Sequence, residues 1–227
     1  MSDWISTQMI FSRYNVENIQ YLGINNINKI AFPMKCFCDI NLHRLKKHVK
    51  NYGYYGLAFS KEWGMRNRVQ AVQYINPDSE LVEDISTILN PIFNLPIDEN
   101  ESEDMSKLKS YAIHQLMYYK PYSEGKQCFT DECEWRFIPK VPDGWPQFIL
   151  NEQDMGNASI NLLNSVIKQK EEFALPFKIE DIKYIIIKSE KDFNCIVQVI
   201  DRLKLNIIKR NRLLSKVIVW NASKEDF

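Results

Sequence analysis

The sequence predicts an α+β protein with a mixed, mainly antiparallel sheet core and flanking helices. Apolar residues alternate with period two in segments such as 69–75, and they recur at spacings of three and four after Asp78. Strands and helices do not alternate regularly, which argues against a doubly wound parallel sheet. The 227 residues, 45% hydrophobic and 26% charged, suit one domain over 1–227 with a sizeable core.

In the first half of the chain, the elements are predicted from apolar period, from β-branched and aromatic content, and from the positions of Gly, Asn and Pro. They are a helix at 4–30 with a turn at 23–26, a strand at 34–40, a helix at 42–49 capped by Asn41 and ended by Gly53, strands at 54–60 and 69–75 with a turn at 61–64 between them, and a helix from 78 that Pro91 breaks.

The second half begins with an acidic segment, 98–107, in which five of ten residues are Asp or Glu. Like charges at this density repel, so the segment is predicted to be a mobile surface loop. After it come a helix at about 108–119, a strand containing Glu132 and Glu134, a long Pro-rich turn at 139–146, a helix at 158–172, a strand at 182–187, a helix at about 190–203 and a last strand at 217–220.

The sequence around Glu132-Cys133-Glu134-Trp135-Arg136 is the first candidate site. Residues two apart in a strand share a face, so Glu132, Glu134 and Arg136 are expected to lie side by side. Two close carboxylates repel, which should raise the pKa of one of them, and such pairs are typical of functional sites. The alternative is an edge strand with solvated charges that ends in a Glu–Arg ion pair.

The second candidate is the block from Tyr52 to Gly64, in which glycines flank adjacent tyrosines and a Ser-Lys-Glu-Trp turn follows. Aromatic rings such as Tyr55 and Trp63 can stack on or cover a flat heteroaromatic ring, and glycine lets a ligand approach the backbone. The alternative is an aromatic-rich core strand. The chain lacks the Gly-rich phosphate loops of Rossmann and P-loop proteins.

Metal binding is not favoured by the Cys and His pattern. Cys36-x-Cys38 and Cys128-x4-Cys133 do not have the spacing of a zinc knuckle. His43 and His48, five residues apart, diverge by about 140° on a helix. A surface or packing role suits His43 better than a ligand contact, although it could reach a ligand across the sheet.

Charge and cysteine content limit the partners and the compartment. Lys+Arg and Asp+Glu both number 29, so no global field draws the chain to nucleic acid or to a membrane. The basic stretch Lys204–Lys216 alternates with Leu and Ile and suits an amphipathic segment with a solvated face. Five cysteines, no signal-peptide pattern and no long apolar run predict a cytoplasmic protein with reduced thiols.

Several of these blocks, in this order, resemble the AbiGi family, which is linked to bacterial abortive-infection defence against phage. The matching residues are 32–40 (FPMKCFCDI), His48, Tyr52-Gly53, 56–64 (GLAFSKEWG), Val72-Gln73-Tyr74 and Glu132-x-Glu134-Trp135-Arg136. The resemblance covers roughly residues 30–140. It implies phage defence and a co-encoded toxin as partner, since the family is commonly labelled the antitoxin of a two-protein system.

The order of elements also resembles an ADP-ribosyltransferase fold, which implies NAD as cofactor and ADP-ribosyl transfer or NAD hydrolysis as reaction. In that comparison Glu134 matches the catalytic glutamate and Glu132 its partner. The expected cofactor-binding residues are Tyr55, Ser60, Trp63, His43 and Arg136. The sequence departs from the pattern in its first strand, which lacks the Arg or His and leaves only His43 or Arg44 just beyond it. The rival hypothesis is a non-catalytic antitoxin that restrains or assembles with a toxin.

Overall fold

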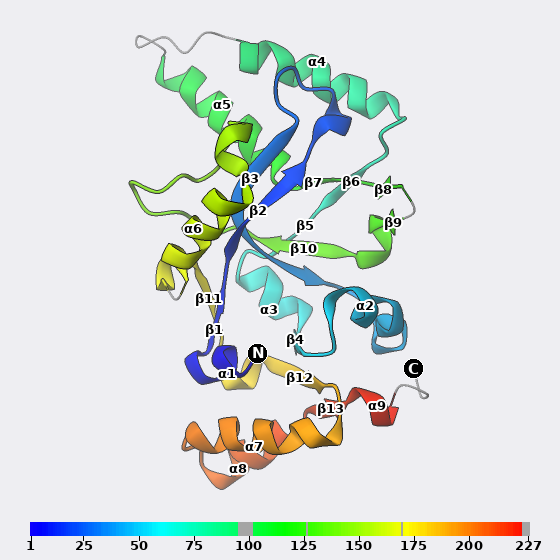
Figure 1. Cartoon of the computed structure of the whole chain (residues 1–227), viewed down its shortest axis with the longest axis vertical. Coiled ribbons are helices and arrows are strands. Elements are labelled where there is room, and N and C mark those ends of the chain that lie inside the picture. Colours follow the sequence, from blue (N-terminus) through cyan, green and yellow to red (C-terminus); the bar gives the residue numbers. More distant parts are fainter. Residues whose placement is uncertain (95–101, 126, 169, 224–227) are drawn as a thin grey trace. The chain divides into compact units, whose positions relative to one another are not determined.

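The computed structural model describes residues 1–94, 102–125, 127–168 and 170–223, which divide into two units, each made of separate stretches of the sequence (Figure 1). Unit 1 combines Met1–Phe11, Asp39–Val69 and Gln169–Phe227, and unit 2 combines Ser12–Cys38 and Gln70–Lys168. The chain passes between the units several times. The sequence predicted one domain over 1–227 and did not indicate this division into units.

Unit 2 is built on a four-stranded antiparallel sheet in the order β2-β3-β10-β5, with smaller sheets β6-β7 and β8-β9. Its main core lies between β3, α4 and α5 and contains Ile30, Phe32, Ile85 and Leu116 among its buried residues. The elements are β2 (Arg13–Asn18), β3 (Lys29–Cys38), β5 (Gln70–Ala71), β6 (Gln73–Ile75), α4 (Glu80–Asn94), α5 (Glu103–Leu116), β7 (Tyr119–Pro121), β8 (Ser123–Glu124), β9 (Gln127–Cys128), β10 (Glu134–Phe137) and α6 (Asn157–Ile167).

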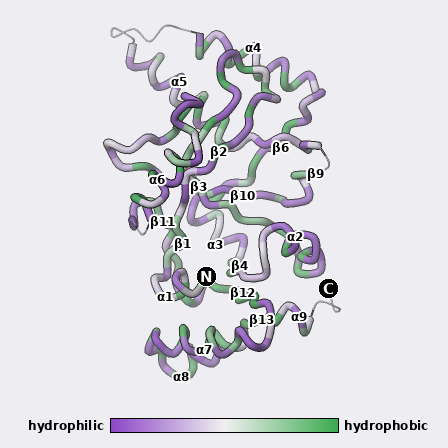
Figure 2. The backbone as a smooth tube through the Cα atoms, in the orientation of Figure 1, coloured by the Kyte–Doolittle hydropathy of each residue, from purple (hydrophilic) through white to green (hydrophobic). Residues whose placement is uncertain are grey.

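Unit 1 contains a three-stranded sheet in the order β13-β12-β4 and the antiparallel pair β1-β11. Figure 2 shows the apolar character of β12, whose Ile182, Ile185 and Ile187 are buried. The elements are α1 (Ser2–Thr7), β1 (Met9–Phe11), α2 (Leu45–Tyr52), β4 (Gly56–Phe59), α3 (Lys61–Arg66), β11 (Ala174–Pro176), β12 (Ile182–Ile187), α7 (Phe193–Arg202), α8 (Ile207–Leu214), β13 (Val217–Val219) and α9 (Trp220–Ser223).

The predicted class, α+β with mostly antiparallel strands, is confirmed, but the predicted helix at 4–30 is wrong. Helix α1 ends at Thr7, and the following Gln8 has φ 55°, a left-handed conformation that stops the helix. Strands β1 and β2 follow, and β2 pairs with β3 over its whole length. The apolar spacing within 4–30 suggested a helix, but pairing with β3 decides in favour of strands.

Three further local predictions are corrected. The expected turn at Lys61–Gly64 lies in α3, which begins after Ser60. The expected strand 69–75 is split, because β5 pairs with β10 whereas β6 pairs in parallel with β7. Pro91 lies inside α4, which continues to Asn94.

The expected mobile loop at 98–107 is wrong in its second half. Residues 103–107 form the first turns of α5, and the Ser102 side chain caps that helix by accepting a hydrogen bond from the Met105 backbone N–H. The remaining residues of the segment, 98–101, lie outside the described ranges.

None of the helices in the described part of the chain has the length and apolar content needed to cross a membrane.

Candidate functional site

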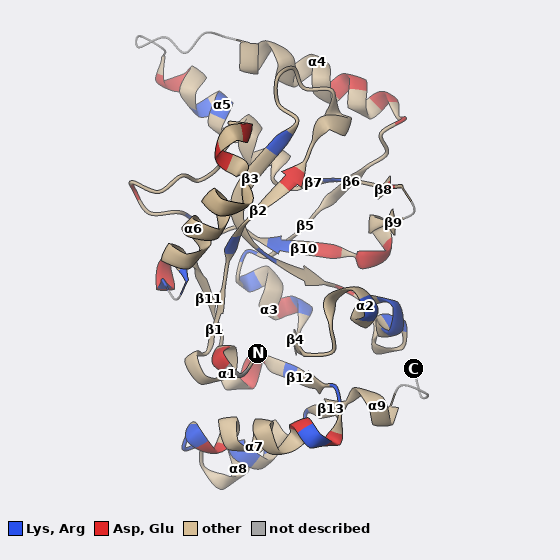
Figure 3. Cartoon of the chain, in the orientation of Figure 1, with Lys and Arg blue, Asp and Glu red and all other residues tan. Residues whose placement is uncertain are grey.

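Strand β10 in unit 2 turns its charged residues inward. Glu134 is 5% exposed and Arg136 is 0% exposed, whereas their neighbours Trp135 and Phe137 are only half-buried. The strand is central, since it pairs with β3 on one side and with β5 on the other. Figure 3 shows the acidic and basic residues of β10 next to each other along the strand. An ion pair therefore occupies positions that an apolar side chain would ordinarily take.

Arg136 is held by three different partners, one for each nitrogen of its guanidinium group. Its Nε lies 2.6 Å from Glu134 Oε1, Nη2 lies 2.7 Å from Glu17 Oε2, and Nη1 donates to the Met117 carbonyl at 2.7 Å. Met117 is the C-cap of α5, where carbonyl groups lack partners within the helix. The guanidinium also lies 5.8 Å from the Phe32 ring centroid. Arg136 thus ties β2, β10 and α5 together.

Lys120, on β7, occupies the other side of Glu134. Its Nζ donates to Glu134 Oε2 and, at 3.2 Å, to Glu132 Oε2. It also lies 4.6 Å from the Phe129 ring centroid. Both carboxylate oxygens of Glu134 therefore contact a cation, one from Arg136 and one from Lys120.

Glu132 and Glu134 converge on Lys120, but not because they share a strand face, as the sequence had predicted. Glu132 ends a short 3₁₀ helix, Phe129–Glu132, and β10 begins only at Glu134. Cys133 between them has φ 44°, a left-handed conformation that changes the chain direction. The second oxygen of Glu132 accepts a hydrogen bond from Gln127 at 3.0 Å.

The backbone of Glu134 is fixed by the segment between β5 and β7. Its N–H donates to the Tyr74 hydroxyl at 2.8 Å, and its carbonyl accepts from the Val72 N–H at 3.1 Å. The side chain and the main chain of this residue are therefore both held. Strands β3, β6 and β7 all help to position Glu134, in addition to its own strand.

The electrostatics of the site differ from the expected repulsion between two carboxylates. Burial by itself would raise the pKa of Glu134, but the positive charges of Arg136 and Lys120 outweigh burial, so its pKa is lowered. Burial would lower the pKa of Lys120, but Glu134 outweighs it and raises that pKa. The expected rise in the pKa of one carboxylate is thus wrong for Glu134, because two cations contact it.

Three carboxylates and two cations make up this buried charge network: Glu17, Glu132, Glu134, Lys120 and Arg136. Glu17 and Lys120 were not identified from the sequence, and Tyr74 appeared there only as part of the Val72-Gln73-Tyr74 motif, without a role at the site. Each lies on a different strand from β10, and no spacing in the sequence connects them. The sequence signal for Glu17 was a charged residue within the β2 segment, and the predicted helix at 4–30 concealed it.

The other predicted site residues belong to unit 1 and have structural contacts of their own. The Ser60 hydroxyl caps α3 by accepting from the Trp63 N–H at 3.1 Å. Trp63 is 3% exposed and stacks on Phe59, with 4.1 Å between ring centroids. Tyr55 is exposed and donates to Asp192 at 3.2 Å, and His43 is exposed at the start of the α2 region. A joint site of these residues with Glu132 and Glu134 stays a prediction.

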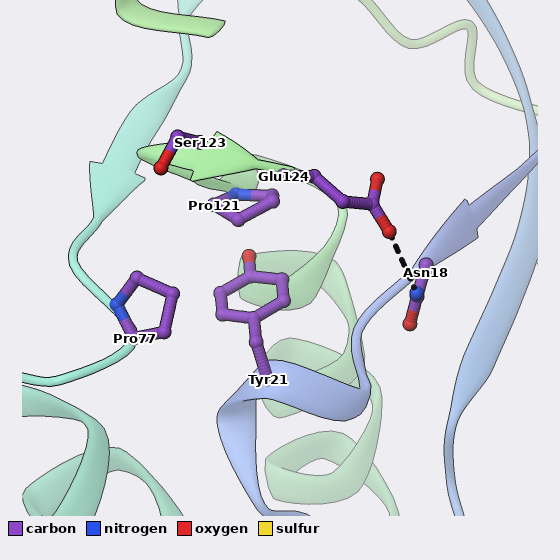
Figure 4. Close-up of a pocket in the computed structure, with 6 residues that line it drawn as sticks. All are labelled: Asn18, Tyr21, Pro77, Pro121, Ser123 and Glu124. Carbon is purple, nitrogen blue, oxygen red and sulfur yellow. Dashed lines mark hydrogen bonds between the residues drawn. The ribbon is translucent and has the colours of Figure 1, made fainter. Parts of the chain in front are cut away.

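A small pocket in unit 2 is lined by Asn18, Tyr21, Pro77, Pro121, Ser123 and Glu124, none of which belongs to the charge network. Its volume is about 70 Å³, and Figure 4 shows the Tyr21 hydroxyl pointing toward Pro121 and Ser123, with Asn18 hydrogen-bonded to Glu124 at 3.4 Å. Neither Glu132 nor Glu134 lines it. In the described ranges, no cluster of three or more His, Cys, Asp or Glu side chains is placed to hold a metal ion.

Comparison with known proteins gives one family and one curated relative. A sequence model of the family described as "Putative abortive phage resistance protein AbiGi, antitoxin" matches residues 8–188. The abortive phage resistance protein AbiGi of Lactococcus lactis subsp. cremoris is 28% identical over an alignment 244 residues long, which covers 95% of this chain and 98% of the relative. No solved structure matches the chain.

Proposed function

Because the AbiGi family model matches most of its length, this chain belongs to the AbiGi family of abortive phage resistance antitoxins, and we propose that it acts by binding and restraining a cognate toxin. The state of Glu134 supports this function more than any other observation. Its carboxylate is buried and both of its oxygens contact cations, so it braces the fold. A glutamate engaged in this way would have to release a cation before it could stabilise a reacting centre.

Exposed apolar side chains give the proposal a second support. Helices α4 and α5 of unit 2 bury one face in the core, yet each also leaves large apolar residues exposed: Leu81 and Ile88 on α4, and Leu108 and Tyr111 on α5. Exposed apolar side chains on neighbouring helices are typical of sites where another protein binds. The proposed occupant of this helix surface is the toxin.

Co-expression with the product of the neighbouring open reading frame tests the proposal. If that product is the toxin, inducing it alone arrests growth, and co-expression of this chain restores growth. The two proteins should also copurify. Undiminished growth arrest and no copurification would overturn the antitoxin function for that pair.

A matched pair of double variants tests the proposed surface. Ile88→Ser with Tyr111→Ser should abolish copurification and growth rescue. Leu162→Ser with Val166→Ser is the control, since both residues are exposed apolar residues on α6. Equal loss in the control, or no loss in the first variant, would exclude α4 and α5 as the toxin-binding surface. The melting temperature of both variants has to match that of the unaltered protein.

NAD-dependent chemistry is the second candidate. One observation favours it: Glu132 and Glu134, the expected catalytic pair, do lie close enough to share Lys120. Against it, Glu134 would have to leave a cation before it could meet a ribose. Incubating the purified chain with NAD and measuring nicotinamide release decides the matter. Release that is lost in a folded Glu132→Gln variant would establish the enzyme, and no release would leave the antitoxin function.

A further inference from the structure

The small pocket of unit 2 is assembled from three stretches of chain that the fold brings together. They are residues 18–21 at the end of β2, residue 77 after β6, and residues 121–124 in β7 and β8. Strands β6 and β7 pair in parallel with Ile75 opposite Pro121, and the Tyr122 N–H donates to the Ile75 carbonyl at 2.7 Å. Backbone pairing therefore holds the proline-containing walls of the pocket in place.

The Tyr21 hydroxyl is an unsatisfied polar group at this pocket. Its oxygen is buried and has no hydrogen-bond partner among the described residues. In Figure 4 it points toward Pro121, which has no N–H, and toward Ser123. Burial raises the pKa of Tyr21 well above its ordinary value, so the hydroxyl stays protonated and neutral. Buried hydroxyl groups are ordinarily hydrogen-bonded, so an unpaired one marks a place for a hydrogen-bonding ligand.

Glu124 supplies the one charge among the six residues that line the pocket. Its carboxylate accepts a hydrogen bond from the Asn18 amide at 3.4 Å, which is long for such a bond. The Asn18 Oδ1 accepts from the Gln20 N–H at 3.0 Å, so the amide is fixed. Lys120, next to the pocket in the sequence, is bound to Glu132 and Glu134. In the described part of the chain, no ion pair neutralises the Glu124 carboxylate.

The pocket has room for a small organic group and is open to a ligand from outside. Its volume is about 70 Å³. One water molecule needs about 10–15 Å³ of such volume. Ser123 and Glu124 are exposed, so the pocket reaches the surface. Two prolines and Tyr21 provide apolar lining, and the carboxylate and the hydroxyl groups provide acceptors.

From these observations we infer that the pocket binds a guanidinium group, carried either by an arginine side chain of a partner protein or by a small free guanidine. Guanidinium is planar and always charged, and it has five N–H donors. One edge can pair with the Glu124 carboxylate while another N–H donates to the Tyr21 hydroxyl. Its flat faces suit a lining of proline and tyrosine rings.

Other ligand classes fit the same groups less well. An ammonium group is compact and strongly hydrated, and its donors radiate from a single atom. An anion would be repelled by Glu124. The inference does not rest on the proposed antitoxin function, because every group that contacts the ligand belongs to unit 2 of this chain.

Access to the Tyr21 hydroxyl requires a small movement of the wall formed by Ser123. Its strand β8 pairs with β9 through the two residue pairs Ser123↔Cys128 and Glu124↔Gln127. So short a ladder resists displacement less than the longer pairing of β2 with β3. Ligand binding should therefore change the environment of 122–124 as well as that of 18–21.

An NMR titration of the ¹⁵N-labelled full chain with N-acetyl-argininamide tests the inference. Saturable shifts are expected at the backbone amides of 18–21 and 122–124, with a Kd of about 1–10 mM because the group in the pocket has few atoms. No saturable shift at about 50 mM ligand, or shifts centred elsewhere, would overturn the inference.

Two matched ligands test the choice of guanidinium. N-acetyl-citrullinamide has almost the same shape without the charge, and it should bind about tenfold more weakly. N-acetyl-lysinamide keeps the charge without the planar donor group and should also bind more weakly. Binding of citrulline as tight as that of arginine would overturn the role of Glu124, and equal binding of lysine would overturn the choice of guanidinium.

Variants of the lining residues locate the site. Glu124→Gln should weaken binding of N-acetyl-argininamide about tenfold, and Tyr21→Phe about threefold. Glu83→Gln is the matched control, since Glu83 is an exposed glutamate of unit 2 that does not line the pocket, and it should keep full affinity. Full affinity in Glu124→Gln or in Tyr21→Phe, or an equal loss in the control, would overturn the inference. Melting temperatures confirm that each variant is folded.

The source of the guanidinium group is decided by comparing methylguanidine with a capped peptide in which glycines flank one arginine. An arginine of a partner protein is the source if the peptide binds at least as tightly as methylguanidine. Binding of methylguanidine without binding of the peptide identifies a small free guanidine, because the pocket then excludes a peptide chain. Either result supports the guanidinium site. These titrations contain no toxin, so their outcome is independent of the copurification test.

Discussion

Arg136 and Glu134 are two residues apart on β10, and their side chains form an ion pair on the buried face of the strand, with 2.6 Å between Arg136 Nε and Glu134 Oε1. Removing a charge from water is costly, and such a pair persists only when the remaining donors and acceptors are satisfied. Here Glu17, Met117 and Lys120 satisfy them. These partners come from β2, β7 and the end of α5, so the ion pair depends on the correct packing of these elements in unit 2.

Glu134→Gln should lower the free energy of unfolding by about 3–5 kcal/mol, because the amide leaves the charges of Arg136 and Lys120 less compensated in a buried site. Glu132→Gln is the matched control and should cost about 1 kcal/mol or less, since Lys120 keeps Glu134 and Glu132 is nearer to solvent. Urea denaturation measures both. An equal loss of unfolding free energy in the two variants would contradict the conclusion that Glu134, rather than Glu132, holds the charge network together.

Acid should weaken the protein through the same carboxylate. The pKa of Glu134 is lowered in the folded state from its ordinary value of 4.5, so the unfolded chain binds more protons at acidic pH. The contribution of Glu134 is therefore present above about pH 4.5 and is lost as the pH falls through the folded pKa. The difference in free energy of unfolding between the unaltered protein and Glu134→Gln should be constant from about pH 7 to about pH 5.5 and should be smaller at about pH 3. A difference that widens in acid would contradict this.

Arg136→Lys should not be tolerated although it preserves the charge. One ammonium group cannot reach Glu134, Glu17 and the Met117 carbonyl in the directions that three guanidinium nitrogens use. Loss of one or more charge-assisted hydrogen bonds should cost about 3 kcal/mol, measured as a lower urea midpoint. The control is Arg13→Lys, which changes an exposed arginine on β2 and should leave the midpoint unchanged.

Ser60→Ala should destabilise unit 1 by about 1 kcal/mol, because the Trp63 N–H loses its capping acceptor at the start of α3. Ser60→Asp keeps an acceptor at the same place and should retain most of the stability. Thermal melting of the three proteins measures the effect. An unchanged melting temperature for Ser60→Ala would show that the hydroxyl has no capping role.

Strong local patterns were enough to predict part of the fold. The strand at 182–187 is observed at the predicted residues, since a run of isoleucines suits a buried strand and little else. Gly53 ends α2 as expected because its φ of 93° favours glycine. The segment 4–30 was misread because its apolar residues fit a helical spacing, whereas pairing with β3 determines the structure of β2.

The candidate site shows the same division between sequence and tertiary structure. The sequence by itself determined that Glu134 and Arg136 lie on one face of a strand, and its motifs identified the AbiGi family. The place it gave Glu132 on the same face was wrong, because Glu132 ends a 3₁₀ helix before the strand begins. Only the tertiary structure decided what these residues do, because it brings Lys120 and Glu17 to them from other strands. The pKa of a carboxylate and the cost of a buried charge depend on neighbours within a few ångströms, and residues distant in sequence provide those neighbours.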